Sequence, residues 1–129
     1  MVRYAETDKM GIVHHSVYPI WYEVARTDFC KQMGFPYEKM EELGVMTPLI
    51  GLECKYKKPA LYDDELEVRA KVSKLTPVRI DFSYEVYKQN ECINTGITSH
   101  ALVGRDRRPI NVKKAYPELW NLISKTIEE

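Results

Sequence analysis

The sequence predicts an α+β fold in which an antiparallel sheet packs against one long hydrophobic helix. Residues 17–33 repeat apolar side chains with the 3.6-residue period of a helix, whereas residues 52–103 largely alternate apolar and polar side chains with the period of 2 that is typical of strands. The strands are segregated from the helix along the chain, which is the order found in α+β folds. A curled sheet wrapped around the helix buries its aromatic side chains best.

The long helix is expected to begin near Ser16 and to end before Gly34. Pro19 is tolerated only in a first helical turn, Ser16 has a side chain suited to an N-cap, and glycine is the usual residue after a helix. One apolar stripe collects the aromatic side chains of this segment: Tyr18, Trp21, Tyr22, Ala25, Phe29 and Met33. Elsewhere on the helix, Glu23 and Arg26 either pair with each other or brace the turn that precedes the helix.

A short amphipathic helix at residues 37–44 is followed by four expected strands. Three segments alternate strictly and predict half-buried antiparallel strands, at residues 52–57, 65–74 and 79–87. Residues 89–91 predict a tight hairpin into residues 92–104, a less polar segment that is expected to lie centrally in the sheet. A basic tract at 105–109 ends the strand pattern, and residues 114–127 predict a terminal amphipathic helix.

The composition is that of one folded domain, which we expect to span residues 1–129. With 44% hydrophobic and 29% charged residues, the chain can bury a core without metals or disulfides. The 19 basic and 19 acidic side chains cancel, so no overall positive field favours nucleic acid or an anionic membrane. The apolar runs are too short to span a bilayer, and the three cysteines form no CxxC pair, so we expect reduced thiols in a cytoplasmic protein.

The residues directly before the long helix carry the groups that favour an active site. In ETDKMGIVHH, residues 6–15, an acid precedes a glycine turn and a histidine pair. A helix N-terminus presents unpaired N–H groups and a partial positive charge, which polarise a carbonyl and stabilise an oxyanion. Asp8 can supply a nucleophile or a general base for acyl transfer, and His15 can orient substrate or water.

Residues 3–26, RYAETDKMGIVHHSVYPIWYEVAR, resemble the signature of the 4-hydroxybenzoyl-CoA thioesterase family and of its bacterial branch in particular. The matching positions are Tyr4, Glu6, Thr7, Asp8, Gly11, Val13, His15, Tyr18, Tyr22, Glu23 and Arg26. Residues 54–68, and residues 95–103 with the RRP at 107–109, are similar to two later segments of the family. The resemblance covers nearly the whole chain and keeps the order of the elements. The sequence departs from the family pattern in its first strand, which is expected to be very short here, because members of the family commonly carry several more residues before the motif.

The resemblance implies a hotdog fold, hydrolysis of acyl-CoA thioesters and no metal or redox cofactor. An acyl-carrier-protein thioester is a second substrate class. The family forms its active sites where two subunits pair, so the partner is a second copy of the chain, in a homodimer or a homotetramer. The alternatives are a non-catalytic acyl-CoA-binding module, which has no need of Asp8, and a dehydratase, whose arrangement of a histidine and a helix-borne acid we do not find.

The resemblance also assigns roles to single residues. The catalytic acid falls on Asp8, as nucleophile or general base, and the helix-start position falls on His15, acting through its backbone N–H or through its ring. Gly11 is expected to be a turn glycine with positive φ that brings the backbone close to substrate. Tyr18 is either a core residue or part of the acyl pocket.

Two clusters of basic side chains can each be interpreted either as solvated surface charges or as a phosphate-binding site. Lys55, Lys57 and Lys58, and likewise Arg105, Arg107 and Arg108, either are solvated surface charges or meet the phosphates of coenzyme A. Of these, Lys57 and Lys58 are assigned to the substrate site. Finally, His100 is expected to be a core or interface histidine, and His14 is expected to point away from the site.

Overall fold

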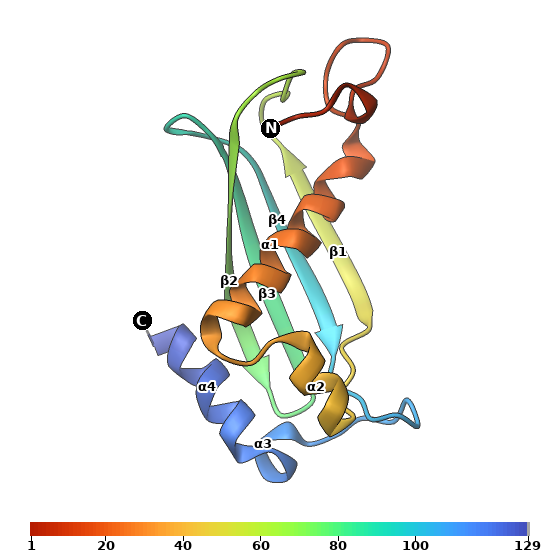
Figure 1. Cartoon of the computed structure of the whole chain (residues 1–129), viewed down its shortest axis with the longest axis vertical. Helices are drawn as coiled ribbons and strands as arrows, with labels where there is room; N and C mark the ends of the chain where they lie inside the picture. The colour runs from red at the N-terminus through yellow and green to blue at the C-terminus, as the bar shows by residue number, and fades with distance from the viewer. Residues whose placement is uncertain (129) are drawn as a thin grey trace.

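The computed structural model describes residues 1–128 and confirms the α+β architecture (Figure 1). Four antiparallel strands form one sheet in the order β1-β4-β3-β2. Their bounds are Leu49–Tyr56 for β1, Leu66–Thr76 for β2, Arg79–Lys88 for β3 and Glu91–Ala101 for β4. The long helix α1, Tyr18–Met33, lies across one face of this sheet.

The expected bounds of α1 are confirmed, but its N-terminal cap is not the predicted one. A 3₁₀ turn, η2 (His15–Val17), leads into α1, Pro19 lies in the first turn, and Gly34 ends the helix with φ 93°. The predicted N-cap at Ser16 is wrong: the His14 side chain accepts a hydrogen bond from the Ser16 N–H at 3.2 Å. Because the 3₁₀ turn starts one residue earlier than a helix capped at Ser16, the capping position falls on His14.

The core lies between α1 and the inner face of the sheet. The ring of Tyr22 is fully buried and stacks on Tyr84 of β3 with ring centroids 4.4 Å apart. The Tyr22 hydroxyl donates a hydrogen bond to the side-chain oxygen of Asn94 on β4. Phe29, about two helical turns after Tyr22, packs edge to face on Phe82 with ring centroids 6.0 Å apart. The expected burial of the aromatic stripe is therefore confirmed in full for Tyr22 and in part for Phe29.

The sheet confirms the central place of residues 92–104, because β4 lies between β1 and β3. The hairpin before it turns at Gln89 and Asn90, with Gln89 at φ 56°. Strand β1 departs from the expected half-burial, since both Leu52 and Tyr56 are about half exposed. The reason is that β1 is an edge strand, paired with β4 alone.

Two expectations at the chain ends are wrong. The strand fragment at the start is a 3₁₀ turn, η1 (Tyr4–Glu6), because the Glu6 carboxylate accepts a hydrogen bond from the Arg3 N–H and closes a turn. The terminal helix is split into α3 (Val112–Ala115) and α4 (Pro117–Glu128), because the residue before a proline avoids helical angles and Tyr116 has φ −136° and ψ 69°.

The remaining helix α2, Tyr37–Leu43, matches its expected position and ends at Gly44, which has φ 82°. It lies at the C-terminal end of α1, on the side of the molecule opposite to the loop that precedes α1 (Figure 1). Across residues 1–128, every helix is too short or too polar to traverse a lipid bilayer.

Candidate active site

The acidic motif folds into a small hairpin whose tip is formed by residues 8–11. Thr7 and Val13 form an isolated antiparallel bridge, and the Asp8 N–H donates to the Ile12 carbonyl at 2.8 Å. Gly11 has φ 79°, which confirms the prediction of a positive-φ turn glycine, and its N–H donates to the Asp8 carbonyl at 3.0 Å. A side chain at residue 11 would meet no atom within 4 Å, so Gly11 serves the turn by its backbone angles alone.

Asp8 is partly exposed within this turn. Its Oδ1 accepts a hydrogen bond from the Met10 N–H at 2.8 Å, which fixes one oxygen of the carboxylate. Within residues 1–128 the other oxygen takes part in no hydrogen bond or ion pair. One oxygen of Asp8 is thus oriented by the turn and the other remains available.

Among the backbone N–H groups of residues 15–17, one has no acceptor within the part of the chain that the structure describes. The Ser16 N–H donates to the His14 ring and the Val17 N–H donates to the His14 carbonyl at 3.0 Å. The N–H of His15, by contrast, has no acceptor among the residues that the structure describes. Since unpaired N–H groups at a helix start attract anions, His15 offers the one donor of these three that can serve a carbonyl oxygen.

Glu6 fastens the hairpin to α1, a role that the sequence did not reveal. The Glu6 carboxylate is buried and accepts a hydrogen bond from the indole N–H of Trp21 at 2.9 Å. The Glu6 carbonyl accepts the His14 N–H at 2.9 Å on the other strand of the hairpin. Hydrogen bonds from the Arg3 backbone and Trp21 hold the pKa of Glu6 below its ordinary value despite the opposing effect of burial. The sequence motif includes Glu6, but nothing in the sequence indicated that its carboxylate would accept a hydrogen bond from Trp21.

Tyr56 joins the edge strand β1 to the same helix start. Its hydroxyl donates to the His15 carbonyl at 3.0 Å, and its ring meets the ring of Tyr18 edge to face at 5.3 Å. Tyr18 is almost fully buried and also packs on Trp21 at 5.0 Å. His15, Tyr18 and Tyr56 therefore form one cluster, whereas Asp8 and Gly11 lie together at the hairpin tip. The sequence indicated only that Tyr56 faces the inner side of its strand, and it did not reveal the contact with His15.

The two lysines assigned to substrate follow β1 directly. Both backbone N–H groups donate to the Ile93 carbonyl, at 3.0 Å for Lys57 and 3.1 Å for Lys58. The Lys58 ammonium pairs with Glu91 at 2.6 Å on the surface, while Lys57 is exposed and belongs to none of the ion pairs in residues 1–128. Lys57 is thus the freer of the two charges.

The arginines of the cluster at residues 105–108 do not share one role in the structure. Arg105 donates from Nη2 to the carbonyls of Glu41 and Glu42, both at 3.2 Å, and so binds the C-terminal end of α2. Arg107 lies in the turn with φ 64°. At least one member of the predicted phosphate cluster therefore serves the fold.

The predicted surface pair of Glu23 and Arg26 is not formed. Arg26 turns toward the sheet and donates to the hydroxyls of Tyr37 at 2.8 Å and Tyr84 at 3.0 Å. The reason is helical geometry, because Arg26 lies four residues after Tyr22 and so faces the same side of α1.

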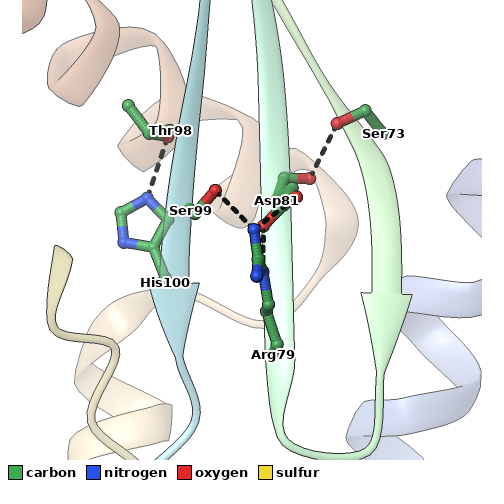
Figure 2. A network of polar contacts seen from close by, with 6 residues as sticks. All are labelled: Ser73, Arg79, Asp81, Thr98, Ser99 and His100. Carbon is green, nitrogen blue, oxygen red and sulfur yellow. Dashed lines mark hydrogen bonds and ion pairs between the residues drawn. The ribbon is translucent and has the colours of Figure 1, made fainter. Parts of the chain in front are cut away.

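His100 is a buried core residue, as the sequence predicted. Through Nδ1 its ring contacts the Thr47 carbonyl at 3.1 Å. Through Nε2 it contacts the Thr98 hydroxyl at 2.9 Å (Figure 2). Figure 2 also shows Ser99, between them in sequence, reaching the opposite way to Arg79, which pairs with Asp81 at 3.0 Å. His14 does not point away from His15: their ring centroids lie 4.2 Å apart, because the capping role of His14 holds its ring over the turn.

Comparison with known proteins links this geometry to one group of enzymes. The family model of the thioesterase-like superfamily matches residues 2–119. The chain is 37% identical over 122 residues to YneP of Bacillus subtilis, provisionally named an acyl-CoA thioesterase, covering 93% of this chain and 88% of that protein. It is 27% identical over 94 residues to the acyl-CoA thioester hydrolase YbgC of Escherichia coli, covering 72% of this chain and 70% of YbgC.

Solved structures agree in fold. The DHNA-CoA thioesterase of Staphylococcus aureus superposes with a TM-score of 0.89 at 36% identity, covering 96% of this chain and 85% of that one. A protein of Aquifex aeolicus superposes with a TM-score of 0.86 at 36% identity, covering 95% of this chain and 94% of that one. The predicted hotdog fold is thereby confirmed.

Proposed function

Because the chain belongs to the thioesterase-like superfamily and is a thioester hydrolase, we propose that it cleaves acyl-CoA thioesters to a free acid and coenzyme A. We further propose that it belongs to the branch represented by YbgC, and the support is its 27% identity to that hydrolase. The observation that carries the proposal is the unpaired N–H of His15 at the start of the helix, on the same hairpin as a carboxylate with one free oxygen. The reaction is proposed to take place in the cytoplasm, as expected from the reduced cysteines.

The proposed mechanism divides the work between Asp8 and His15. The thioester carbonyl oxygen accepts the His15 N–H, which stabilises negative charge on that oxygen as the carbonyl carbon is attacked. Asp8 acts in one of two ways: its carboxylate attacks the carbon, expels the thiolate and forms a mixed anhydride that water cleaves, or it removes a proton from the attacking water. In both, the thiolate takes up a proton and leaves as coenzyme A. The His15 ring is free to position the water.

Removing the charge of Asp8 is the first test. Asp8→Asn keeps an oxygen for the Met10 N–H, so the turn is expected to persist while kcat falls by about 100-fold or more. Acyl-CoA hydrolysis by the two proteins, followed through free thiol release, measures this. Asp63→Asn is the matched control, since Asp63 lies in another turn with φ 69°, which asparagine also accepts. Full activity in Asp8→Asn would overturn the mechanism, and tight acyl-CoA binding without turnover in the unmodified protein would favour a non-catalytic binding module.

Single-turnover hydrolysis in ¹⁸O water distinguishes the two roles of Asp8. A nucleophilic carboxylate becomes labelled when water cleaves the anhydride at the Asp8 carbonyl, whereas a general base stays unlabelled. The substrate panel includes acyl-CoA and acyl-carrier-protein thioesters. We expect coenzyme A to be preferred, with Lys57 and Lys58 contacting its phosphates and Gly11 and Tyr18 bordering the acyl group.

We further propose that two copies of the chain pair through β1 in a homodimer, alone or within a homotetramer. The support is that β1 is an unpaired edge whose large apolar side chains are about half exposed: Leu49, Ile50, Leu52 and Tyr56. Such an edge is suited to strand pairing with another copy. Because Tyr56 also contacts His15, pairing at β1 would place the second copy next to the proposed site.

Leu52→Lys tests this pairing. An added charge on an exposed position leaves the monomer intact but places like charges together at a two-fold interface, so the mass measured by light scattering is expected to fall to that of one chain. Val78→Lys, at an exposed apolar residue in the turn between β2 and β3, is the control and should keep the mass of the unmodified protein. A single-chain mass for the unmodified protein would contradict the proposal.

A further inference from the structure

A cavity of about 540 Å³ lies between α2 and the middle of α1, where Glu23 and Arg26 line it. It is bounded by α1, α2, the segment before β1 and the loop after β4, and its apolar wall consists of Met40, Val45, Met46 and Val103. Arg26 of α1 forms part of its lining. The proposed mechanism uses none of these residues.

Arg26 is only partly satisfied by the protein. Nε donates to the Tyr37 hydroxyl and Nη1 donates to the Tyr84 hydroxyl, at 2.8 and 3.0 Å. A guanidinium carries five N–H groups, so three remain, and both of those on Nη2 are among them. These three have no acceptor within residues 1–128.

Among the residues that the structure describes, the charge of Arg26 also has no carboxylate partner, although the guanidinium carbon lies 6.0 Å from the centroid of the Phe82 ring, at the limit of a cation–π contact. Arg26 takes part in none of the ion pairs found in residues 1–128, and its two hydrogen-bond partners are neutral hydroxyls. Its effect on neighbours is visible at His100, where the charge of Arg26 adds to burial in lowering the pKa. A half-buried cation without an anion is costly, and an anion that reaches the free N–H groups would offset that cost.

The two acids that line the cavity do not fill this role. Glu23 and Glu41 are exposed side chains on α1 and α2, where water solvates them, whereas Arg26 is partly buried. The cavity therefore combines a partly buried guanidinium with an apolar wall. A planar carboxylate matches two parallel N–H donors of the guanidinium, and an aliphatic tail matches the wall.

We propose that this cavity binds a monocarboxylate with a short aliphatic chain, the carboxylate resting on the free N–H groups of Arg26 and the chain on Met40, Val45, Met46 and Val103. This site is separate from the one proposed for thioester hydrolysis, and the inference does not depend on that reaction. The free acid released by such a reaction would belong to the same class of ligand.

Titration with hexanoate tests the proposal, with hexanamide as an uncharged probe of the same shape. In ¹H–¹⁵N spectra, hexanoate is expected to shift the Nε–H signal of Arg26, and calorimetry is expected to show hexanoate binding about tenfold or more tightly than hexanamide. Equal affinity for the two probes, or an unmoved Arg26 signal, would overturn the proposal.

Two variants localise the binding. Arg26→Gln is expected to weaken hexanoate binding by about tenfold or more, while Arg107→Gln, which removes an exposed arginine that also lines the cavity, should leave it within about twofold. If Arg26→Gln does not fold, Met46→Trp takes its place: Met46 is about half exposed, so tryptophan can be accommodated while filling the cavity, and binding should be lost. Hexanoate binding that survives Met46→Trp would contradict the proposed site.

The active-site variant separates this inference from the proposed function. Asp8→Asn should bind hexanoate with the affinity of the unmodified protein, because Asp8 does not line the cavity. Loss of binding in Asp8→Asn would show that hexanoate binds at the active site instead and would overturn the present inference, whatever the result of the hydrolysis assay.

Discussion

Two regions of the molecule differ in how they hold their key side chains: the hairpin of residues 6–15 and the aromatic core under α1. In the hairpin, backbone hydrogen bonds of the turn hold Asp8 and the Tyr56 hydroxyl holds the His15 carbonyl, and the side chains are partly exposed for Asp8 and exposed for His15. In the core, Tyr22 and Tyr84 are held by packing and stacking and are buried. Substitutions in the hairpin are therefore expected to change chemistry more than stability, and substitutions in the core to do the reverse.

Gly96→Ala should give the largest change in stability. A Cβ at residue 96 of β4 would lie 2.6 Å from the hydroxyl oxygen of Tyr22 and closer still to a carbon of its ring. The ring cannot move aside, because it stacks on Tyr84 and its hydroxyl is bonded to Asn94. We expect a loss of about 1–3 kcal/mol in the free energy of unfolding, measured by urea denaturation. Gly51→Ala is the control, since its Cβ would meet Ser99 at an ordinary 3.5 Å; an equal loss there would refute the packing argument.

Gly11→Ala should have a smaller effect on stability and a larger one on activity. The position has φ 79° but open space around it, so only backbone strain opposes alanine, at a cost of about 1–2 kcal/mol. The strain is expected to displace Asp8 and to lower kcat for acyl-CoA hydrolysis. Gly11→Asn should restore much of both properties, because asparagine tolerates positive φ. A variant with alanine that keeps full activity would show that the turn does not orient Asp8.

The pH dependence of stability should be the smallest effect and should come from the core. Burial, and then the charge of Arg26, hold the pKa of His100 below its ordinary value of 6.5. Between the folded and unfolded pKa values the unfolded chain binds more protons, so stability is full above about pH 6.5 and falls as the pH drops through the folded pKa. Urea denaturation between pH 7.5 and 5.5 measures the slope. Replacing His100 with glutamine should flatten it; an unchanged slope would assign the effect to another group.

Local patterns determined most of the elements of this fold. The apolar period fixed α1, Gly34 and Gly44 marked the ends of two helices, and the alternating segments gave three of the strands. The order of residue types in ETDKMGIVHH also identified Gly11 as a positive-φ turn and Asp8 as the acid of that turn. These features depend on neighbours within a few residues, which the sequence contains directly.

The tertiary structure alone decided which side chains meet across the fold. Trp21 as the partner of Glu6 and Tyr56 as the partner of His15 lie 15 and 41 residues apart in the chain, and no local pattern encodes such distances. The same holds for Arg26, which was expected to pair with Glu23. It instead donates to Tyr37 and Tyr84, which lie 11 and 58 residues away in the chain. Burial of α1 against the sheet turned Arg26 inward, since the free energy of packing a whole helix face outweighs that of one exposed ion pair.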